Sequence, residues 1–141
     1  MSLQSLDVCT RESLDAARAM AALVDRQSSS SEFAAARERF MAAMRSHHAT
    51  TDAVLLAPLR ESDDCAHHAM ARRATEQDLA RRELVAEHFA AWPAEAIRAD
   101  APRYRRAVRQ LLRMLERRNA YQEQVLLPMA MEALAMRREA A

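Results

Sequence analysis

The sequence predicts an all-α protein folded as an up-down-up-down antiparallel four-helix bundle, with one domain over residues 1–141. Glycine is absent and alanine supplies 32 residues. A β-rich fold needs turns at positive φ, which glycine tolerates best, whereas alanine is the best helix former. Apolar residues also recur three and four apart in four stretches separated by three breakers. Four helices with one apolar stripe each can hide those stripes against one another.

The first helix is expected over residues 3–25, where the inner positions are spaced three and four apart: Leu6, Ser13, Ala17, Met20 and Val24. A run of serines ends it, and Ser29 with Glu32 has the spacing of a capping box. The second helix is expected over residues 32–59. Its predicted inward ridge is Met41, Met44, His48, Asp52, Leu55 and Leu59.

The third helix is expected to begin after a cap at Ser62-Asp63-Asp64 and to end near residue 91, before Trp92-Pro93. A connector with one helical turn over residues 94–98 follows. Asp100-Ala101-Pro102 then begins the fourth helix, because proline is tolerated in a first turn. This helix is expected to reach about residue 138, with a kink at Pro128.

The second predicted helix carries the first candidate site. His48 and Asp52 are four residues apart, so both side chains leave the same face of the helix. They lie on the predicted inward ridge. A buried histidine and carboxylate at this spacing can ligate a metal in a bundle core, or they can form a hydrogen-bonded polar pair.

The fourth predicted helix repeats the pattern of the second. When Pro58 and Pro128 are superimposed, His48 falls on Arg118. The pattern resembles the hemerythrin-like, or HHE cation-binding, family. In that family the second and fourth helices each carry a histidine, a glutamate four residues on, and a proline ten after the histidine. The resemblance covers nearly the whole chain in helix order, helix lengths and both prolines, and it implies a di-iron centre completed by histidines of the first and third helices.

The chain departs from the family at most ligand positions. Asp52 replaces a glutamate, Gln122 stands at the glutamate position of the fourth helix, and Arg118 stands at its histidine position. Arginine stays protonated in proteins and does not ligate metals. On the third helix the position falls at Glu76 or Gln77, and the first helix has no histidine. We therefore expect a retained fold whose metal site has been lost.

Charge suggests what replaces the metal. Asp52 and Arg118 are expected to face each other across the core. An unpaired charge buried there costs several kcal/mol, so these groups should pair or reach water. The expected salt bridge is bordered by His48, Glu76 and Gln122. These five residues are the candidate site, either as a polar core or as the lining of a small pocket.

The resemblance and its departures lead to a metal-free, non-catalytic binding or regulatory module that requires no cofactor and takes a protein partner or a small ligand. The first alternative is a variant metal-binding protein that holds iron or another divalent ion through His48, Asp52, Glu76 and Glu123, and senses oxygen, nitric oxide or redox state. The second is a purely structural bundle that forms a homodimer through a helix face. No serine or cysteine nucleophile with an adjacent base is recognisable.

Composition excludes other classes of protein. No apolar run reaches the length of about 20 residues that spans a bilayer, and the first residues lack the pattern of a signal peptide. All 21 basic residues are arginine, but 20 acids leave a net charge of +1, which argues against nucleic-acid binding. Two cysteines, Cys9 and Cys65, form no disulfide framework, so a cytoplasmic protein is expected.

Two further clusters are expected to lie on the surface rather than in a site. His67 and His68 are too far along the bundle to converge with His48, so surface or partly buried positions are expected. Four arginines spaced four apart on the fourth predicted helix are interpreted as a solvated face: Arg105, Arg109, Arg113 and Arg117.

Overall fold

The computed structural model describes residues 1–141 and contains helices without strands. The α-helices are α1 (Leu3–Asp25), α2 (Ser30–Thr51), α3 (Ala57–Glu61), α4 (Cys65–Ala91), α5 (Ala94–Ala99), α6 (Ala101–Tyr121) and α7 (Leu127–Ala140). Two π-helical segments, η1 (Asp52–Leu56) and η2 (Gln122–Leu126), join α2 to α3 and α6 to α7. The all-α prediction is confirmed.

Local caps explain why the helices begin where they do. Ser29 and Glu32 form the predicted capping box at the start of α2. Asp64 accepts a hydrogen bond from the backbone N–H of Ala66 at 2.8 Å, and Asp100 accepts one from Arg103 at 3.2 Å. These contacts satisfy backbone donors that the first helical turn leaves free.

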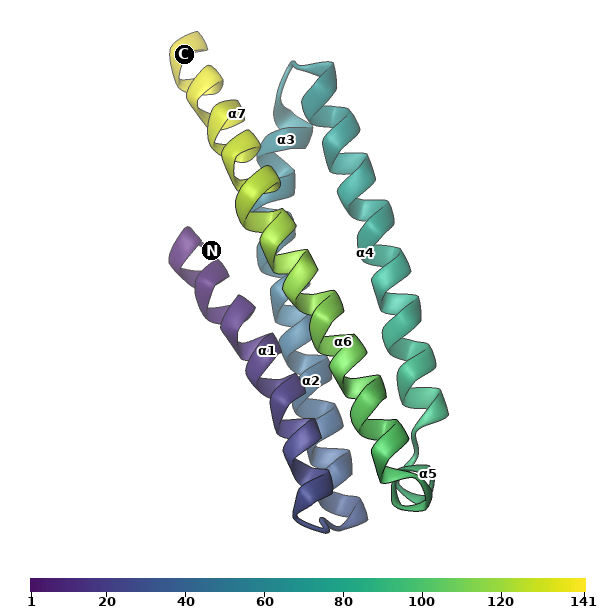
Figure 1. Ribbon diagram of the computed structural model, residues 1–141. Helices are drawn as coiled ribbons and strands as arrows, with labels where there is room; N and C mark the ends of the chain where they lie inside the picture. The colour runs from purple at the N-terminus through teal and green to yellow at the C-terminus, as the bar shows by residue number, and fades with distance from the viewer.

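The long helices are not equally close together. α1 packs against both α2 and α6, whereas α4 is held mainly at its start, through α3. Figure 1 shows α4 standing off from the other long helices, with α5 connecting its lower end to α6. The backbone of α4 therefore approaches its neighbours less closely than the backbone of α1 approaches α2 and α6.

The prolines are accommodated by π-helical turns. η1 and η2 begin at Asp52 and Gln122, at the same distance before Pro58 and Pro128. The kink expected at Pro128 takes this form, with continuous helix on both sides. Because a proline ring clashes with the carbonyl four residues earlier, a widened turn with one extra residue relieves the contact. The same turn shifts every residue before it around the helix.

The core consists of two apolar clusters with a polar layer between them. One cluster, near α3 and α7, includes Leu55, Leu59 and Leu126; the other, between α1, α2 and α6, includes Phe40 and Leu115. The polar layer is formed by buried side chains on the same helix faces as the two clusters: Ser13, His47, Thr50, Arg118 and Gln122. A smaller cluster of Ile97, Tyr104 and Val108 closes the α5 end.

Candidate functional site

Hydrogen bonds join α1, α2 and α6 within the polar layer. Nε2 of His47 donates to Oε1 of Gln122 at 2.8 Å, since the amide oxygen can only accept. The amide nitrogen of Gln122 donates to Oγ1 of Thr10 at 3.2 Å. Arg118 donates to Oγ of Ser13 at 2.8 Å. Each of the three helices thus contributes to one buried network.

Arg118 lies in this layer without a carboxylate partner. The residue is 6% exposed. Its Nε and Nη2 donate to Oδ1 of Asn119 at 3.0 and 2.9 Å, and Nη1 reaches only the sulfur of Met44 at 3.4 Å. Burial, reinforced by the charge of Arg81, lowers the pKa of Arg118 to about 10. The positive charge of Arg118 is therefore poorly compensated by its surroundings in the folded chain.

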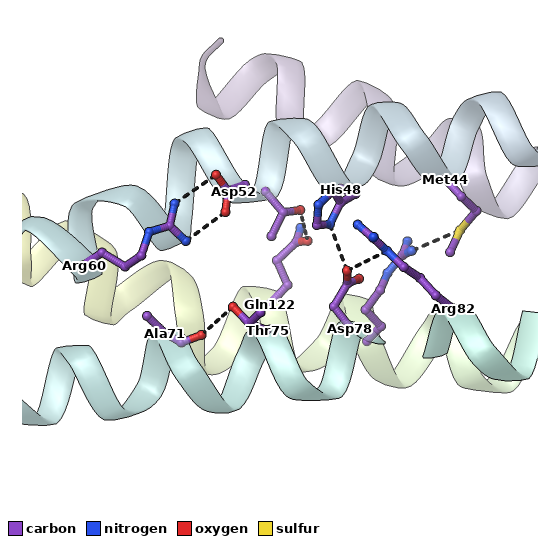
Figure 2. Close-up of polar contacts among 11 residues, drawn as sticks. Met44, His48, Asp52, Arg60, Ala71, Thr75, Asp78, Arg82 and Gln122 are labelled. Carbon is purple, nitrogen blue, oxygen red and sulfur yellow. Dashed lines mark hydrogen bonds and ion pairs between the residues drawn. The ribbon is translucent and has the colours of Figure 1, made fainter. Parts of the chain in front are cut away.

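The predicted salt bridge between Asp52 and Arg118 is wrong. Both carboxylate oxygens of Asp52 accept hydrogen bonds from Arg60, each at 2.9 Å, as Figure 2 shows. Hydrogen bonding from Arg60 also lowers the pKa of Asp52. This pair is about half exposed and keeps much of its hydration, which a pair inside the core would lose. Asp52 thus turns toward solvent.

The predicted inward ridge of the second helix is displaced by one residue. His47 is buried at 4% exposure, whereas the side chain of His48 is 44% exposed. A regular α-helix traced backward from Leu55 would place His48 on the inner face. The extra residue in the turn of η1 brings His47 there instead. Nδ1 of His48 instead meets Asp78 of α4 at 2.8 Å, across the space in Figure 2.

A cavity of about 280 Å³ lies beside the polar layer, between α2, α4 and α6. Four of the five predicted site residues line it: His48, Asp52, Arg118 and Gln122. Glu76 does not; it is exposed on another face of α4, beside a surface hollow. Glu123 is exposed as well. The structure therefore brings the α2 and α6 positions together and leaves out the two glutamates.

Gln77, the alternative to Glu76 on this helix, does line the cavity, but three charged lining residues of α4 were missed by the sequence analysis. Asp78 accepts from His48 and from Nε of Arg82 at 3.1 Å. Arg81 has a buried Nε without a hydrogen-bond partner. The signal was the spacing of Ala71, Ala74 and Val85, the small and apolar buried residues of α4. That stripe passes through Asp78 and Arg81 and excludes Glu76.

The donor set does not fit a metal centre. No three His, Cys, Asp or Glu side chains are placed so that they could hold a metal ion. Burial, together with the charge of Arg118, lowers the pKa of His47 to about 3, so its imidazole is neutral and a very weak base. A general base works best with a pKa near the working pH, and His47 is far from it.

The histidines and cysteines outside the cavity have structural surroundings. The expectation of a surface or partly buried position is wrong for His67, which is buried and pairs through Nδ1 with Oγ of Ser62 at 2.7 Å, whereas His68 is partly buried. Cys9 is buried and Cys65 exposed, and neither forms a disulfide. The arginine stripe of α6 is largely exposed, as predicted.

No protein-family model, curated protein or solved structure matches the chain. None of the helices combines the length and the apolar character that crossing a membrane requires.

Proposed function

We propose that the chain is a non-catalytic binding module built on a hemerythrin-like, up-down-up-down four-helix bundle, in which the former metal positions line a ligand cavity. The single observation that carries this proposal is that His48, Asp52, Arg118 and Gln122 line one cavity while no three donors converge. A lost metal centre leaves such a cavity if the surrounding helices keep their positions.

The arrangement of the helices supports the bundle topology. In Figure 1 the chain reverses direction after α1, after α3 and after α4, and the paired π-helical turns precede equivalent prolines. The two halves of the chain therefore share a backbone irregularity as well as a sequence pattern. π-helical turns occur frequently at functional sites, and both of these adjoin the cavity through Asp52 and Gln122.

The proposed compartment is the cytoplasm, where thiols remain reduced. The two cysteines are free, which agrees with a reducing environment. A regulatory role would couple occupation of the cavity to the position of α4, since this helix forms one wall and is the least closely packed of the long helices.

Two measurements on the full chain test the proposal. Protein expressed with added iron is analysed for metal content and visible absorption, and we expect far less than one iron per chain. About two irons per chain, as in di-iron bundles, would overturn the proposal in favour of a metal-binding protein.

In parallel, NMR spectra are recorded with a set of neutral, cationic and anionic compounds of low mass. We expect at least one compound to perturb Tyr121, Thr75 and His47, which line the cavity. Perturbations confined to other surfaces would count against it.

A further inference from the structure

The charges of the cavity lining do not balance. Its charged residues, histidines aside, are four arginines and two aspartates: Arg60, Arg81, Arg82, Arg118, Asp52 and Asp78. Each aspartate already has an arginine partner, because Asp52 pairs with Arg60 and Asp78 with Arg82. Arg81 and Arg118 remain, and neither takes part in any ion pair of the chain.

These two guanidinium groups come to the cavity from different helices. Arg81 belongs to α4 and Arg118 to α6, and both line the same space. The Nε of Arg81 is buried with no hydrogen-bond partner, and Nη1 of Arg118 contacts only a thioether sulfur. Burying such donors without a hydrogen-bond partner costs free energy. A negatively charged acceptor would supply the missing hydrogen bonds.

The other lining residues indicate the size and polarity of a molecule that would carry this negatively charged acceptor. Toward η1 and η2 the wall becomes apolar at Leu56, Ala74 and Leu126. Ala74 precedes Arg81 by seven residues, which is about 10 Å along a helix. The volume of about 280 Å³ lies just below the range of about 300–1,000 Å³ for pockets that hold drug-sized ligands. The cavity therefore suits a small molecule with a charged head and a short apolar body.

We propose that the cavity binds a small organic oxoanion, whose carboxylate or phosphate oxygens lie between Arg81 and Arg118 and whose apolar body extends toward Leu56 and Leu126. This inference rests on the proposed function and names the ligand class of the same cavity. Guanidinium groups suit both head groups, because their planar donors match two oxygens at once. An apolar body adds contact with the leucines, which an inorganic anion cannot provide.

Calorimetric titration of the full chain tests the inference with three probes at constant ionic strength: inorganic phosphate, acetate and butyrate. Sodium chloride serves as the blank. We expect acetate and phosphate to bind weakly and butyrate to bind about 15-fold more tightly than acetate, since each of its two additional methylenes contributes about fourfold when buried. Equal affinity for acetate and butyrate would overturn the placement of the apolar body, and a preference for phosphate over butyrate would identify a phosphate head instead of a carboxylate.

Variants distinguish the cavity from general attraction to a basic surface. Arg81→Met and Arg118→Met are each expected to weaken butyrate binding at least about tenfold. Arg109→Met is the matched control, since Arg109 is exposed on α6 outside the lining, and it should change affinity less than about twofold. Circular dichroism verifies that each variant remains folded.

Two outcomes overturn the inference: no heat from any anion in the wild-type chain, or binding that Arg81→Met and Arg118→Met leave unchanged. Failure of this inference is separable from failure of the proposed function. Neutral or cationic compounds that perturb the cavity residues would retain a binding module and reject only the oxoanion. Stoichiometric iron would reject the proposed function itself.

Discussion

The buried charge of Arg118 is expected to destabilise the folded chain, because no opposite charge pairs with it. Its guanidinium is buried and has neutral hydrogen-bond partners but no carboxylate. Replacement by methionine keeps most of the volume and removes the uncompensated charge. We expect Arg118→Met to raise the free energy of unfolding by about 1–3 kcal/mol, since replacing even paired buried charges by apolar side chains of similar volume can stabilise a protein by about 1–4 kcal/mol. Urea denaturation at neutral pH measures it.

Two controls accompany this measurement. Arg109→Met, on the exposed side of α6, should change stability by less than about 0.5 kcal/mol. A double-mutant cycle between Asp52 and Arg118 should give almost no coupling, whereas Asp52 and Arg60 should couple by about 0.5 kcal/mol as an exposed pair. A loss of more than about 2 kcal/mol in Arg118→Met would mean that its bonds to Ser13 and Asn119 outweigh the cost of its charge.

His47 makes stability depend on pH in a defined direction. Its pKa is about 3 in the folded chain because of burial and Arg118, against an ordinary value of 6.5. Below that ordinary value the unfolded chain binds a proton that the folded chain does not. The free energy of unfolding therefore falls as pH decreases from 6.5 toward 3, by up to about 1.4 kcal/mol per unit, and His47 adds no pH dependence above that window. Urea titrations at several pH values measure the slope.

His47→Gln is the matched variant, since its amide can still donate to Gln122. Its stability should decline less steeply between neutral pH and about pH 5 than that of the wild type. A residual slope is expected from His88, whose pKa is also lowered, by burial and by Arg37. Identical slopes in wild type and His47→Gln would show that His47 takes up a proton in the folded chain.

At the scale of elements, α4 is the least anchored of the long helices. It has 27 residues, of which four are buried: His67, Ala71, Ala74 and Val85. α1 buries seven of its 23. We expect backbone amides in residues 76–84 of α4 to exchange hydrogen at least about tenfold faster than those in residues 13–20 of α1, because opening α4 exposes little apolar surface. Hydrogen exchange with mass spectrometry measures both segments, and equal protection would contradict this account.

Sequence predicts elements well where their signals are local. The caps at Ser29, Asp64 and Asp100 placed three helix starts correctly, since each is decided within one turn. The π-helical turns were not predicted, although Pro58 and Pro128 marked their positions. Because the extra residue of η1 was not predicted, His48 was placed on the inner face of the helix instead of His47.

The α4 side of the site was harder to predict for a different reason. α4 carries charged residues nearly all around, with two exposed leucines, Leu79 and Leu84. An inner face is recognised by its contrast with polar neighbours, and the buried alanines of α4 give little contrast. Of the two candidates on this helix, Gln77 lines the cavity and Glu76 does not, and Asp78 and Arg81 were missed.

At the scale of the whole molecule, the proposed relationship to hemerythrin-like bundles can be tested by rebuilding donors. Nε2 of His47 lies 2.8 Å from Oε1 of Gln122, and Arg118 is one turn before Gln122 on the same helix. The double variant Arg118→His with Gln122→Glu would place three donors around the present polar layer. We expect its melting temperature to rise with the logarithm of added cobalt or zinc, and that of the wild type to stay constant.

Adding His47→Gln to the double variant should abolish this rise, because one of the three donors is lost. Asp52 is left unchanged, since both of its carboxylate oxygens already accept hydrogen bonds from Arg60. A folded double variant that ignores both metals would show that these positions do not converge, and the hemerythrin-like interpretation would then be abandoned.

The long sequence separation within the polar layer also governs how the chain assembles during synthesis. Arg118 follows its partner Ser13 by 105 residues, and Gln122 follows Thr10 by 112. At a translation rate of about 5–20 residues per second, α1 leaves the ribosome about 5–20 s before its partners on α6. Of the two helices that pack against α1, only α2 is present during that interval, and the side of this nascent hairpin that later contacts α6 stays in water. The rate of translation, rather than the rate of helix formation, therefore sets how long the unfinished protein is exposed to aggregation and to chaperones.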